Sequence, residues 1–314
     1  MPARTARRRL SVRPILGAPR RGQAVYIMTQ AESERWVSAA AAAGDALVHV
    51  SAPCRRGATG HLHGADGLVV TTARAVAGRE RLEVAQGERE SAAQVLGYDA
   101  ATDIGVVRLE TPLGTPPVWS TAVAPLGFQV LSATRPGRAV RVRLGIVSQL
   151  GEAWHTPRGG RVERYVETDL APEPGFSGGL AFDSESRVVG VSTAGLLRGV
   201  PLLLPQPTVE RVVSAILQHG RVRRGYLGVG TQAVRLGDPA WPFGLLVSSV
   251  QPGSAAERAG LLIGDVLLEM AAAALSDASA LQAALEDSEG QVLPLSLLRG
   301  GQKLSVEVTP GARS

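Results

Sequence analysis

Residues 173–180 read EPGFSGGL and place Ser177 among three glycines. This pattern is typical of a nucleophile that another molecule must approach closely, because glycine leaves no side chain around the hydroxyl. A serine hydroxyl is nevertheless a weak nucleophile unless a base lies within hydrogen-bond reach. The motif therefore predicts a serine-based active site only if another part of the chain supplies that base.

Length and composition indicate a globular protein of about two domains, with 314 residues, 45% hydrophobic and 19% charged. Residues 1–27 contain seven arginines and no acidic residue, and subtracting these seven charges from the net charge of +5 leaves −2 for residues 28–314. We interpret residues 1–28 as a basic disordered arm. We expect no nucleic-acid binding, because the remainder of the chain is close to neutral.

No segment of the sequence predicts a transmembrane helix. The longest run without charges, residues 111–134, contains four prolines. The arginine-rich start lacks the continuous apolar stretch of a secretory signal, so we expect a cytoplasmic rather than a periplasmic location. Met28 is an alternative start to Met1. A single cysteine, Cys54, excludes an intrachain disulfide.

Short valine-rich segments predict strands over most of the first two thirds of the chain. They cover residues 46–50, 67–72, 81–85, 103–110, 139–150, 161–168 and 187–193. Many short strands without helices between them indicate a sandwich or a barrel. We expect a helix before this region, over residues 31–43 and stopped by Gly44, and another after it, over residues 207–217.

The last part of the chain has a different pattern, in which strands alternate with two short helices. The first helix begins at the capping-box signature Ser254-Ala-Ala-Glu257 and ends at Gly260. The second spans residues 278–285, with Asp277 as its cap. These elements predict a small α+β module.

Three motifs occur in the order of a protease triad: GLVVTTARAV (67–76), TDIGVVRL (102–109) and TDLAPEPGFSGG (168–179). This succession resembles the HtrA (Deg) family of trypsin-like serine proteases. Residues 223–230, 251–270 and 297–309 resemble the PDZ domain that follows the protease in that family. The resemblance implies a mostly β fold, with a trypsin-like double β-barrel over residues 29–218 and a PDZ domain over residues 219–314.

The same resemblance assigns roles to site residues. Asp103 corresponds to the orienting acid, Ser177 to the nucleophile, and the N–H groups of Gly175 and Ser177 to the oxyanion hole. Arg74 stands where the family has its histidine. A guanidinium is permanently protonated and has no acceptor lone pair, so it cannot take the proton of the serine. The resemblance therefore implies a pseudoprotease with a vestigial site; an active serine endopeptidase using another base is the alternative.

Two departures from the family pattern lead to structural expectations. We expect Arg74 to form a bidentate pair with Asp103, so that Arg74→Ala destabilises the fold more than Ser177→Ala does. Phe176, where the family has asparagine, either fills the entrance of the cleft or packs on a loop.

The histidines do not supply an evident base. We interpret His49, His155 and His219 as structural or solvated residues. His61 and His63 share one face of a strand but have no evident third ligand, so we predict no metal or cofactor. His63 is the best alternative base. The Gly-x-Ser-x-Gly pattern of α/β-hydrolases is excluded by the order of elements around the serine.

The PDZ-like part predicts a groove for peptides. In the family, the loop at residues 224–229 offers N–H groups to a terminal carboxylate, and the peptide adds as a strand. The predicted peptide-binding residues are Tyr226, Leu227, Gly228, Val229, Leu281 and Leu285. We expect peptide C-termini or unfolded proteins as partners, and a homo-oligomer (trimer) or an assembly with active relatives. Alanines at 271–274 replace the usual Asn-Gly of one turn, which we expect to be remodelled.

Overall fold

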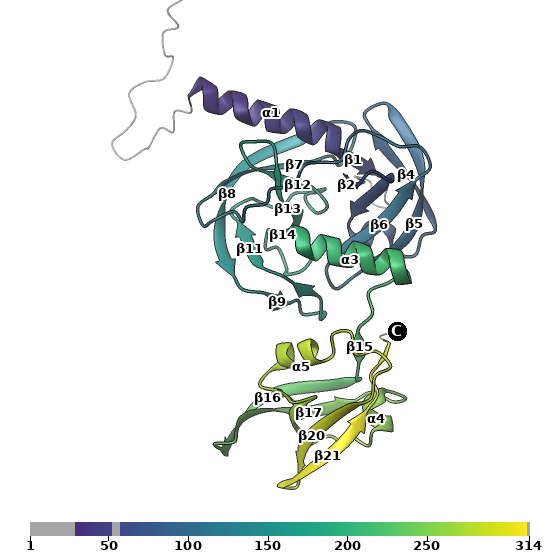
Figure 1. The fold of residues 1–314 in the computed structure, drawn as a ribbon, viewed down its shortest axis with the longest axis vertical. Helices are drawn as coiled ribbons and strands as arrows, with labels where there is room; N and C mark the ends of the chain where they lie inside the picture. The colour runs from purple at the N-terminus through teal and green to yellow at the C-terminus, as the bar shows by residue number, and fades with distance from the viewer. Residues whose placement is uncertain (1–28, 52–56, 313–314) are drawn as a thin grey trace, which may run out of the picture.

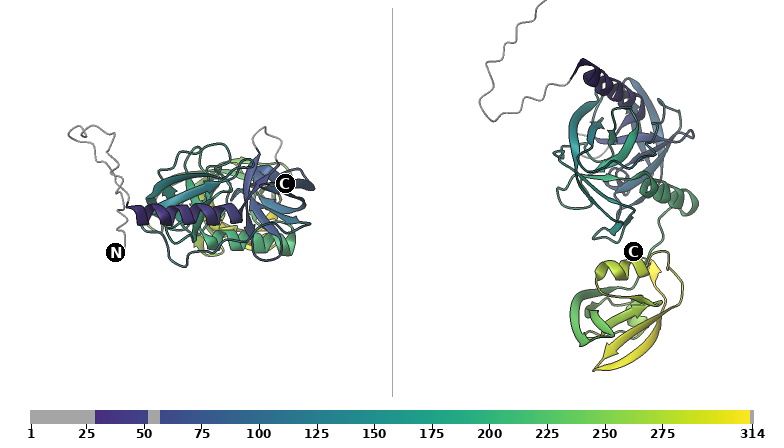
Figure 2. Two further views of the ribbon diagram at one scale, coloured as in Figure 1. Left: turned by 90° about the horizontal axis from the view of Figure 1, so that it is seen from above. Right: turned by 60° about the vertical axis from the view of Figure 1, so that its left-hand side comes forward.

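The computed structural model describes residues 29–51 and 57–312. The arm expected over residues 1–28, and Cys54, lie outside the described residues. Two closed β-barrels form the larger part, and a smaller unit lies below them in Figure 1. The right-hand view of Figure 2 shows that a single stretch of chain connects the barrels to this unit. The mostly β double-barrel fold expected from the sequence is confirmed.

The first barrel is built from antiparallel neighbours throughout. Its strands, in order around the barrel, are β1 (Leu47–Val50), β2 (Ala58–His63), β3 (Leu68–Thr71), β6 (Ile104–Leu109), β5 (Arg89–Asp99) and β4 (Arg81–Gln86). A one-turn helix, α2 (Ala73–Val76), follows β3 and packs on β6. Gly105 makes this approach possible, because a Cβ there would lie 2.5 Å from Val76.

The second barrel repeats the architecture. Its strands, in order, are β11 (Tyr165–Thr168), β14 (Leu202–Leu204), β13 (Val188–Thr193), β12 (Leu180–Phe182), β7 (Gln129–Thr134) and β8 (Arg141–Gly151). A small pair, β9 (Trp154–His155) and β10 (Arg161–Val162), lies beside it. One hydrophobic cluster joins Val70 and Ile104 of the first barrel to Leu131 and Leu180 of the second. The two barrels therefore pack directly on each other.

Two long helices flank the barrels. Helix α1 (Gln30–Ala46) begins at a capping box formed by Thr29 and Glu32. The predicted stop at Gly44 is wrong: the helix continues to Ala46, whose buried side chain packs in the cluster that joins the barrels. Tertiary packing here outweighs the low helix propensity of one glycine. Helix α3 (Gln206–His219) ends at Gly220 with φ 72°, a left-handed C-terminal residue.

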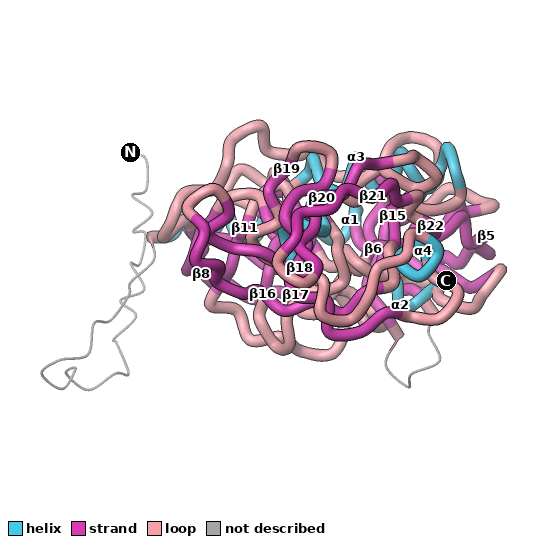
Figure 3. The backbone as a smooth tube through the Cα atoms, turned by 90° about the horizontal axis from the view of Figure 1, so that it is seen from below, coloured by secondary structure: helices cyan, strands magenta, loops and turns pink. Residues whose placement is uncertain are grey.

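The C-terminal unit is a sheet with two short helices, and Figure 3 views it from below. The sheet order is β16 (Val229–Asp238), β17 (Trp241–Val250), β18 (Val266–Met270), β20 (Leu293–Arg299) and β21 (Gln302–Val308), while β19 (Ala273–Ala274) pairs with β18, and β15 (Gly225–Tyr226) with β22 (Gly311–Ala312). Helices α4 (Ala255–Arg258) and α5 (Ala278–Ala284) are capped by Ser254 and Asp277, as predicted. Glu257, however, accepts from the N–H of Gly253 instead of closing the capping box on Ser254.

The turn between β18 and β19 keeps its hairpin geometry, so the expected remodelling is wrong. Met270 pairs with Ala273, which leaves a two-residue loop. Ala271 and Ala272 have φ 48° and 66°. Positive φ at both loop residues is the type I′ conformation that matches strand twist, and the two alanines adopt it although glycine or asparagine suits it better.

No helix within the described residues is long and apolar enough to cross a membrane. The boundary predicted between residues 218 and 219 falls at the end of α3. The extents of independently folding units stay a prediction.

Candidate functional site

Ser177 follows a tight turn set by Pro174 and Gly175. The N–H of Phe176 donates to the carbonyl of Glu173 at 2.8 Å, and Gly175 has φ 86°. Proline followed by a glycine at positive φ, closed by this hydrogen bond, is a type II turn. A Cβ at position 175 would lie 2.4 Å from Pro136. Glycine is therefore required for two reasons, because of its positive φ and because a side chain has no space.

Phe176 holds this turn in place from inside the second barrel. Its side chain is 5% exposed and packs with Leu170, Ala181 and Leu203. Of the two expected roles, filling the cleft entrance is therefore wrong. The phenyl ring lies in the barrel core and anchors the backbone on either side of it.

Two backbone N–H groups at this turn have no partner among the described residues, although their neighbours do. Within residues 29–51 and 57–312, neither the N–H of Gly175 nor that of Ser177 has a hydrogen-bond partner. The carbonyl of Gly175 accepts from Thr59 Oγ1 at 2.7 Å, which fixes the orientation of that residue. Ser177 Oγ itself accepts from the N–H of Ala194 at 3.1 Å. The predicted role of the two N–H groups as an oxyanion hole stays a prediction.

Asp103 precedes β6 in a left-handed conformation with φ 57°. Its Oδ2 accepts from the hydroxyl of Thr193 at 3.0 Å. Burial raises the pKa of Asp103, and the Thr193 hydroxyl and the N–H of Ala73 partly offset this effect. Because Thr193 is followed directly by Ala194, the structure brings Asp103 and Ser177, predicted from separate motifs, to one site.

Arg74 does not form the expected bidentate pair with Asp103. Its side chain is exposed on α2, and no ion pair or hydrogen bond of Arg74 occurs among the described residues. Burial raises the pKa of Asp103, and the charge of Arg74 opposes that shift only through space. The expectation was wrong because Thr193 and Ala73 already supply Asp103 with donors, so the acid does not need a guanidinium.

Among the described residues, His61, His63 and His155 contact groups other than the serine hydroxyl. In the part of the chain that the structure describes, no histidine nitrogen forms a hydrogen bond with Ser177 Oγ. His61 is fully buried with Nδ1 3.4 Å from the carbonyl of Gly178, and burial, helped by the nearby His63, lowers its pKa to about 3. His63 Nε2 lies 3.6 Å from Glu210. The described residues also contain no group of three or more potential metal ligands.

The predicted peptide-binding residues come together at one cavity. Tyr226, Leu227, Gly228 and Val229 line it on one side, and Leu281 and Leu285 line it from the region of α5, around a volume of about 850 Å³. Gly228 has φ 80°, and a Cβ there would lie 2.3 Å from Ser254. Leu227, Leu281 and Leu285 are largely buried and also belong to the core of this unit.

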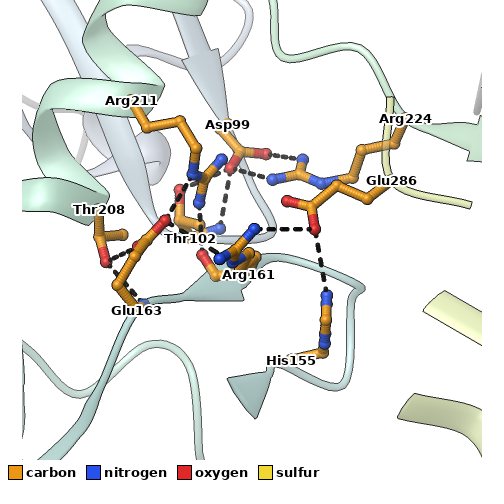
Figure 4. Close-up of polar contacts among 9 residues, drawn as sticks. All are labelled: Asp99, Thr102, His155, Arg161, Glu163, Thr208, Arg211, Arg224 and Glu286. Carbon is orange, nitrogen blue, oxygen red and sulfur yellow. Dashed lines mark hydrogen bonds and ion pairs between the residues drawn. The ribbon is translucent and has the colours of Figure 1, made fainter. Parts of the chain in front are cut away.

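The barrels form the opposite wall of this cavity, which the sequence did not predict. Tyr98, Asp99 and Arg158 line it together with the loop at residues 224–229. Arg224 donates two hydrogen bonds to Asp99, at 2.6 and 2.9 Å (Figure 4). Although burial alone would raise the pKa of Asp99, the hydrogen bonds and the charge of Arg224 lower it.

A second polar contact joins the two units beside the first. Glu286 lies 3.6 Å from Arg161 Nη1 and 3.8 Å from His155 Nε2 (Figure 4). Arg161 and His155 belong to the small pair β9–β10, whose sequence carries no motif. Sequence reasoning missed this interface because its residues are ordinary charged residues of two separate regions.

Two family models match the chain. The model described as a trypsin-like peptidase domain matches residues 58–191, and the model described as a PDZ domain matches residues 225–309. The first match runs from β2 into β13 and leaves only β1 and β14 of the barrel strands outside it, and the second covers nearly all of the C-terminal unit.

Several curated proteins are similar over most of the chain. A Synechocystis protein named "Putative serine protease HhoA" is 31% identical over 77% of this chain and 67% of its own length. A Haemophilus influenzae protein named "Probable periplasmic serine protease do/HhoA-like" is 30% identical over 79% of this chain. A Halomonas elongata protein named "Probable periplasmic serine endoprotease DegP-like" is 30% identical over 81%. The chain spans 56% of the length of the latter two.

Solved structures share the fold over nearly the whole chain. The HtrA-type protease AlgW with a decapeptide has a TM-score of 0.72 and 24% identity, covering 89% of this chain and 99% of that one. The serine endoprotease from Yersinia pestis has a TM-score of 0.72 and 24% identity, covering 92% and 100%.

The expected cytoplasmic location is contradicted by these comparisons. The relatives from Haemophilus influenzae and Halomonas elongata carry names that describe them as periplasmic. The expectation rested on charges and prolines in residues 1–27, and that region lies outside the described residues.

Proposed function

Because this chain belongs to the HtrA family of trypsin-like serine proteases with a C-terminal PDZ domain, we propose that it is a pseudoprotease that binds peptides instead of cleaving them. One observation carries the proposal. In the described part of the chain, the single hydrogen-bond partner of Ser177 Oγ is the N–H of Ala194, a donor that cannot take a proton.

The proposal places Arg74 at the position of the missing base. Arg74 follows β3 by three residues and lies on α2, next to Ala73, whose N–H interacts with Asp103. An arginine remains protonated at every working pH, so the serine stays unactivated. Removal of the base of a triad lowers turnover by about a million-fold, while binding groups leave a residual acceleration of about a thousand-fold over water.

We place peptide binding in the cavity between the PDZ domain and the barrels. The carbonyls of Leu227 and Gly228 accept from Ala256 and Gln251, while the N–H groups of Leu227 and Gly228 have no partner within the described ranges. Such N–H groups, beside an apolar wall, suit the terminal carboxylate of a peptide. The proposed partners are peptide C-termini or unfolded proteins. We also propose a homo-oligomer, a trimer or an assembly with active relatives, outside the cytoplasm.

The alternative is an active serine endopeptidase, and the names of the relatives favour it. All three relatives named above are called serine proteases or endoproteases. The retained pairing of Asp103 with Thr193 and of Ser177 with Ala194 is also compatible with activity. This alternative requires a base at Ser177 Oγ. All five histidines of the chain lie within the described residues, so the base would come from a rearrangement that brings one of them, such as His63, to the serine, or from a second chain.

Degradation of casein by the purified full chain separates the two functions, with Ser177→Ala as the control. The proposed function predicts no difference between wild type and Ser177→Ala. Cleavage by the wild type at ordinary protease rates that the Ser177→Ala variant lacks establishes the alternative instead.

A further inference from the structure

We propose that the site around the partly exposed Ser177, called the cleft below, binds carboxylates, and that its ligand is the C-terminal carboxylate of a peptide. This inference rests on the proposed function, because a working base would commit the cleft to catalysis. The site consists of the N–H groups of Gly175 and Ser177, the hydroxyl of Ser177 and the guanidinium of Arg74.

The two backbone donors are held ready for a ligand. The type II turn fixes Gly175, the buried ring of Phe176 anchors the next residue, and Thr59 holds the carbonyl of Gly175 at 2.7 Å. Neither the N–H of Gly175 nor that of Ser177 has a partner among the described residues. A rigid pair of unpartnered N–H groups binds an anion without further ordering of the backbone.

The serine hydroxyl is available as a third donor. Its oxygen accepts from the N–H of Ala194 at 3.1 Å, and no described residue accepts its proton. A hydroxyl whose oxygen is engaged in this way still has one hydrogen to donate. In an active protease this hydrogen goes to the base, whereas here it is left for a ligand.

Arg74 adds a permanent positive charge. Its side chain is exposed and has no hydrogen-bond or ion-pair partner within residues 29–51 and 57–312. Its neighbour Ala73 faces Asp103, and Asp103 is linked through Thr193 to the strand end that contacts Ser177. The long arginine side chain therefore starts at the edge of the same site.

Replacing an imidazole by a guanidinium leaves the groups that face a ligand as donors, because the acceptor Asp103 is already engaged by the hydroxyl of Thr193 and the N–H of Ala73. An ionised carboxylate is the complementary ligand, because it only accepts hydrogen bonds. Hydrogen bonds to ionised groups are about twice as strong as those between neutral groups. A peptide end fits best, since a terminal carboxylate occupies the position where a scissile carbonyl would lie. Its second oxygen then replaces the departing amine and faces the cation. Peptides of this kind are the products of endoproteolysis, so the chain would act after a protease.

The test is an NMR titration of the full chain, with the amides of Gly175 and Ser177 as local probes. The ligand is N-acetyl-tetraalanine as the free acid, compared with its C-terminal amide. We expect the acid to shift both amide resonances saturably and the amide to leave them unchanged. The amides of Tyr226 to Val229 report the PDZ groove in the same spectra. Shifts there, with none at Gly175 and Ser177, overturn the proposal.

Two variants test the role of the cation. Arg74→Gln should weaken the binding of the free-acid peptide to the cleft about tenfold, which corresponds to 1.4 kcal/mol. The matched control is Arg108→Gln, which removes an exposed arginine of β6 and should leave the affinity unchanged. Equal affinities of wild type and Arg74→Gln for the acid contradict the proposal.

A third probe distinguishes the two sources of a carboxylate. An amidated peptide with one internal aspartate should bind the cleft more weakly than the free acid; tighter binding overturns the assignment to a chain end. The casein assay keeps the two proposals separate. If the chain does not cleave casein and the free-acid peptide leaves the amide resonances of Gly175 and Ser177 unchanged, this inference alone is overturned. Serine-dependent cleavage of casein overturns the proposed function instead.

Discussion

Asp103 and Ser177 are connected through two consecutive residues at the end of β13. The hydroxyl of Thr193 donates to Asp103 at 3.0 Å, and the N–H of Ala194 donates to Ser177 at 3.1 Å. These two hydrogen bonds, called the frame of the site below, fix Asp103 and Ser177 relative to each other through a hydroxyl and a main-chain N–H. On our account this frame persists without a base, because neither hydrogen bond involves the residue at position 74.

This frame leads to the first prediction, that Arg74→Ala leaves stability almost unchanged. Arg74 is exposed and forms no ion pair among the described residues, and surface substitutions usually change the free energy of unfolding by about 0.5 kcal/mol or less. Melting temperatures of Arg74→Ala and Ser177→Ala should therefore be similar. A marked loss of stability in Arg74→Ala alone points to a pair with Asp103 in solution.

The second prediction concerns the contact between the barrels and the PDZ domain. Asp99 is 5% exposed and receives both hydrogen bonds of Arg224. Removing one partner of a buried ion pair costs about 3–5 kcal/mol, so Asp99→Asn should weaken the contact between the barrels and the PDZ domain. Trypsin should then cleave the connection at residues 219–224 faster than in wild type.

The control for this experiment is Arg81→Gln. Arg81 pairs with Glu110 on the first barrel, where both side chains are more than half exposed. Such pairs contribute about 0–1 kcal/mol. Equal rates of cleavage in Asp99→Asn, Arg81→Gln and wild type argue that the Asp99–Arg224 pair does not hold the units together.

The third prediction is a dependence of stability on pH that comes from His61. Burial lowers its pKa from 6.5 to about 3, so in acid the unfolded chain binds a proton that the folded chain does not. The stabilisation is complete above pH 6.5 and is lost as the pH falls toward 3, by up to about 1.4 kcal/mol per pH unit. The free energy of unfolding, measured with denaturant, should be about 2 kcal/mol lower at pH 5 than at pH 7 because of this residue.

His61→Leu should flatten this dependence, since leucine does not titrate. His219→Gln is the control, because His219 is exposed at the end of α3. If His61→Leu and wild type lose stability in parallel between pH 7 and pH 5, His61 is not buried as a neutral group.

The fourth prediction concerns the hairpin loop of the PDZ domain. Ala272 has φ 66°, and an alanine in the left-handed region costs about 1–2 kcal/mol relative to a right-handed conformation, a cost that glycine avoids. Ala272→Gly should therefore raise the melting temperature. Ala274→Gly, in the extended strand β19, should lower it. If the melting temperature falls in both variants, Ala272 does not adopt the left-handed conformation in this loop.

The sequence predicted the parts of this molecule that repeat a local pattern. The alternating strands and the cap at Asp277 were predictable because each lies in a motif with a fixed spacing. Asp103 and Ser177 also lie in such motifs, and the structure brings them to one site, while their catalytic roles stay a prediction. Arg74 was recognised as unusual, but its expected partner was wrong, since a sequence does not show that Thr193 and Ala73 already serve Asp103. The Asp99–Arg224 contact joins residues 125 positions apart without any motif, so it could only be found in three dimensions.

Ser177 is proposed to lack nucleophilicity, and its rate of modification by a fluorophosphonate measures this property without dependence on a peptide substrate. We predict that wild type is labelled no faster than Ser177→Ala, and that Arg74→His, which places an imidazole at the position proposed for the missing base, is labelled measurably at Ser177. Rapid labelling of wild type at Ser177 contradicts the proposed pseudoprotease function, because it requires a base that activates the hydroxyl.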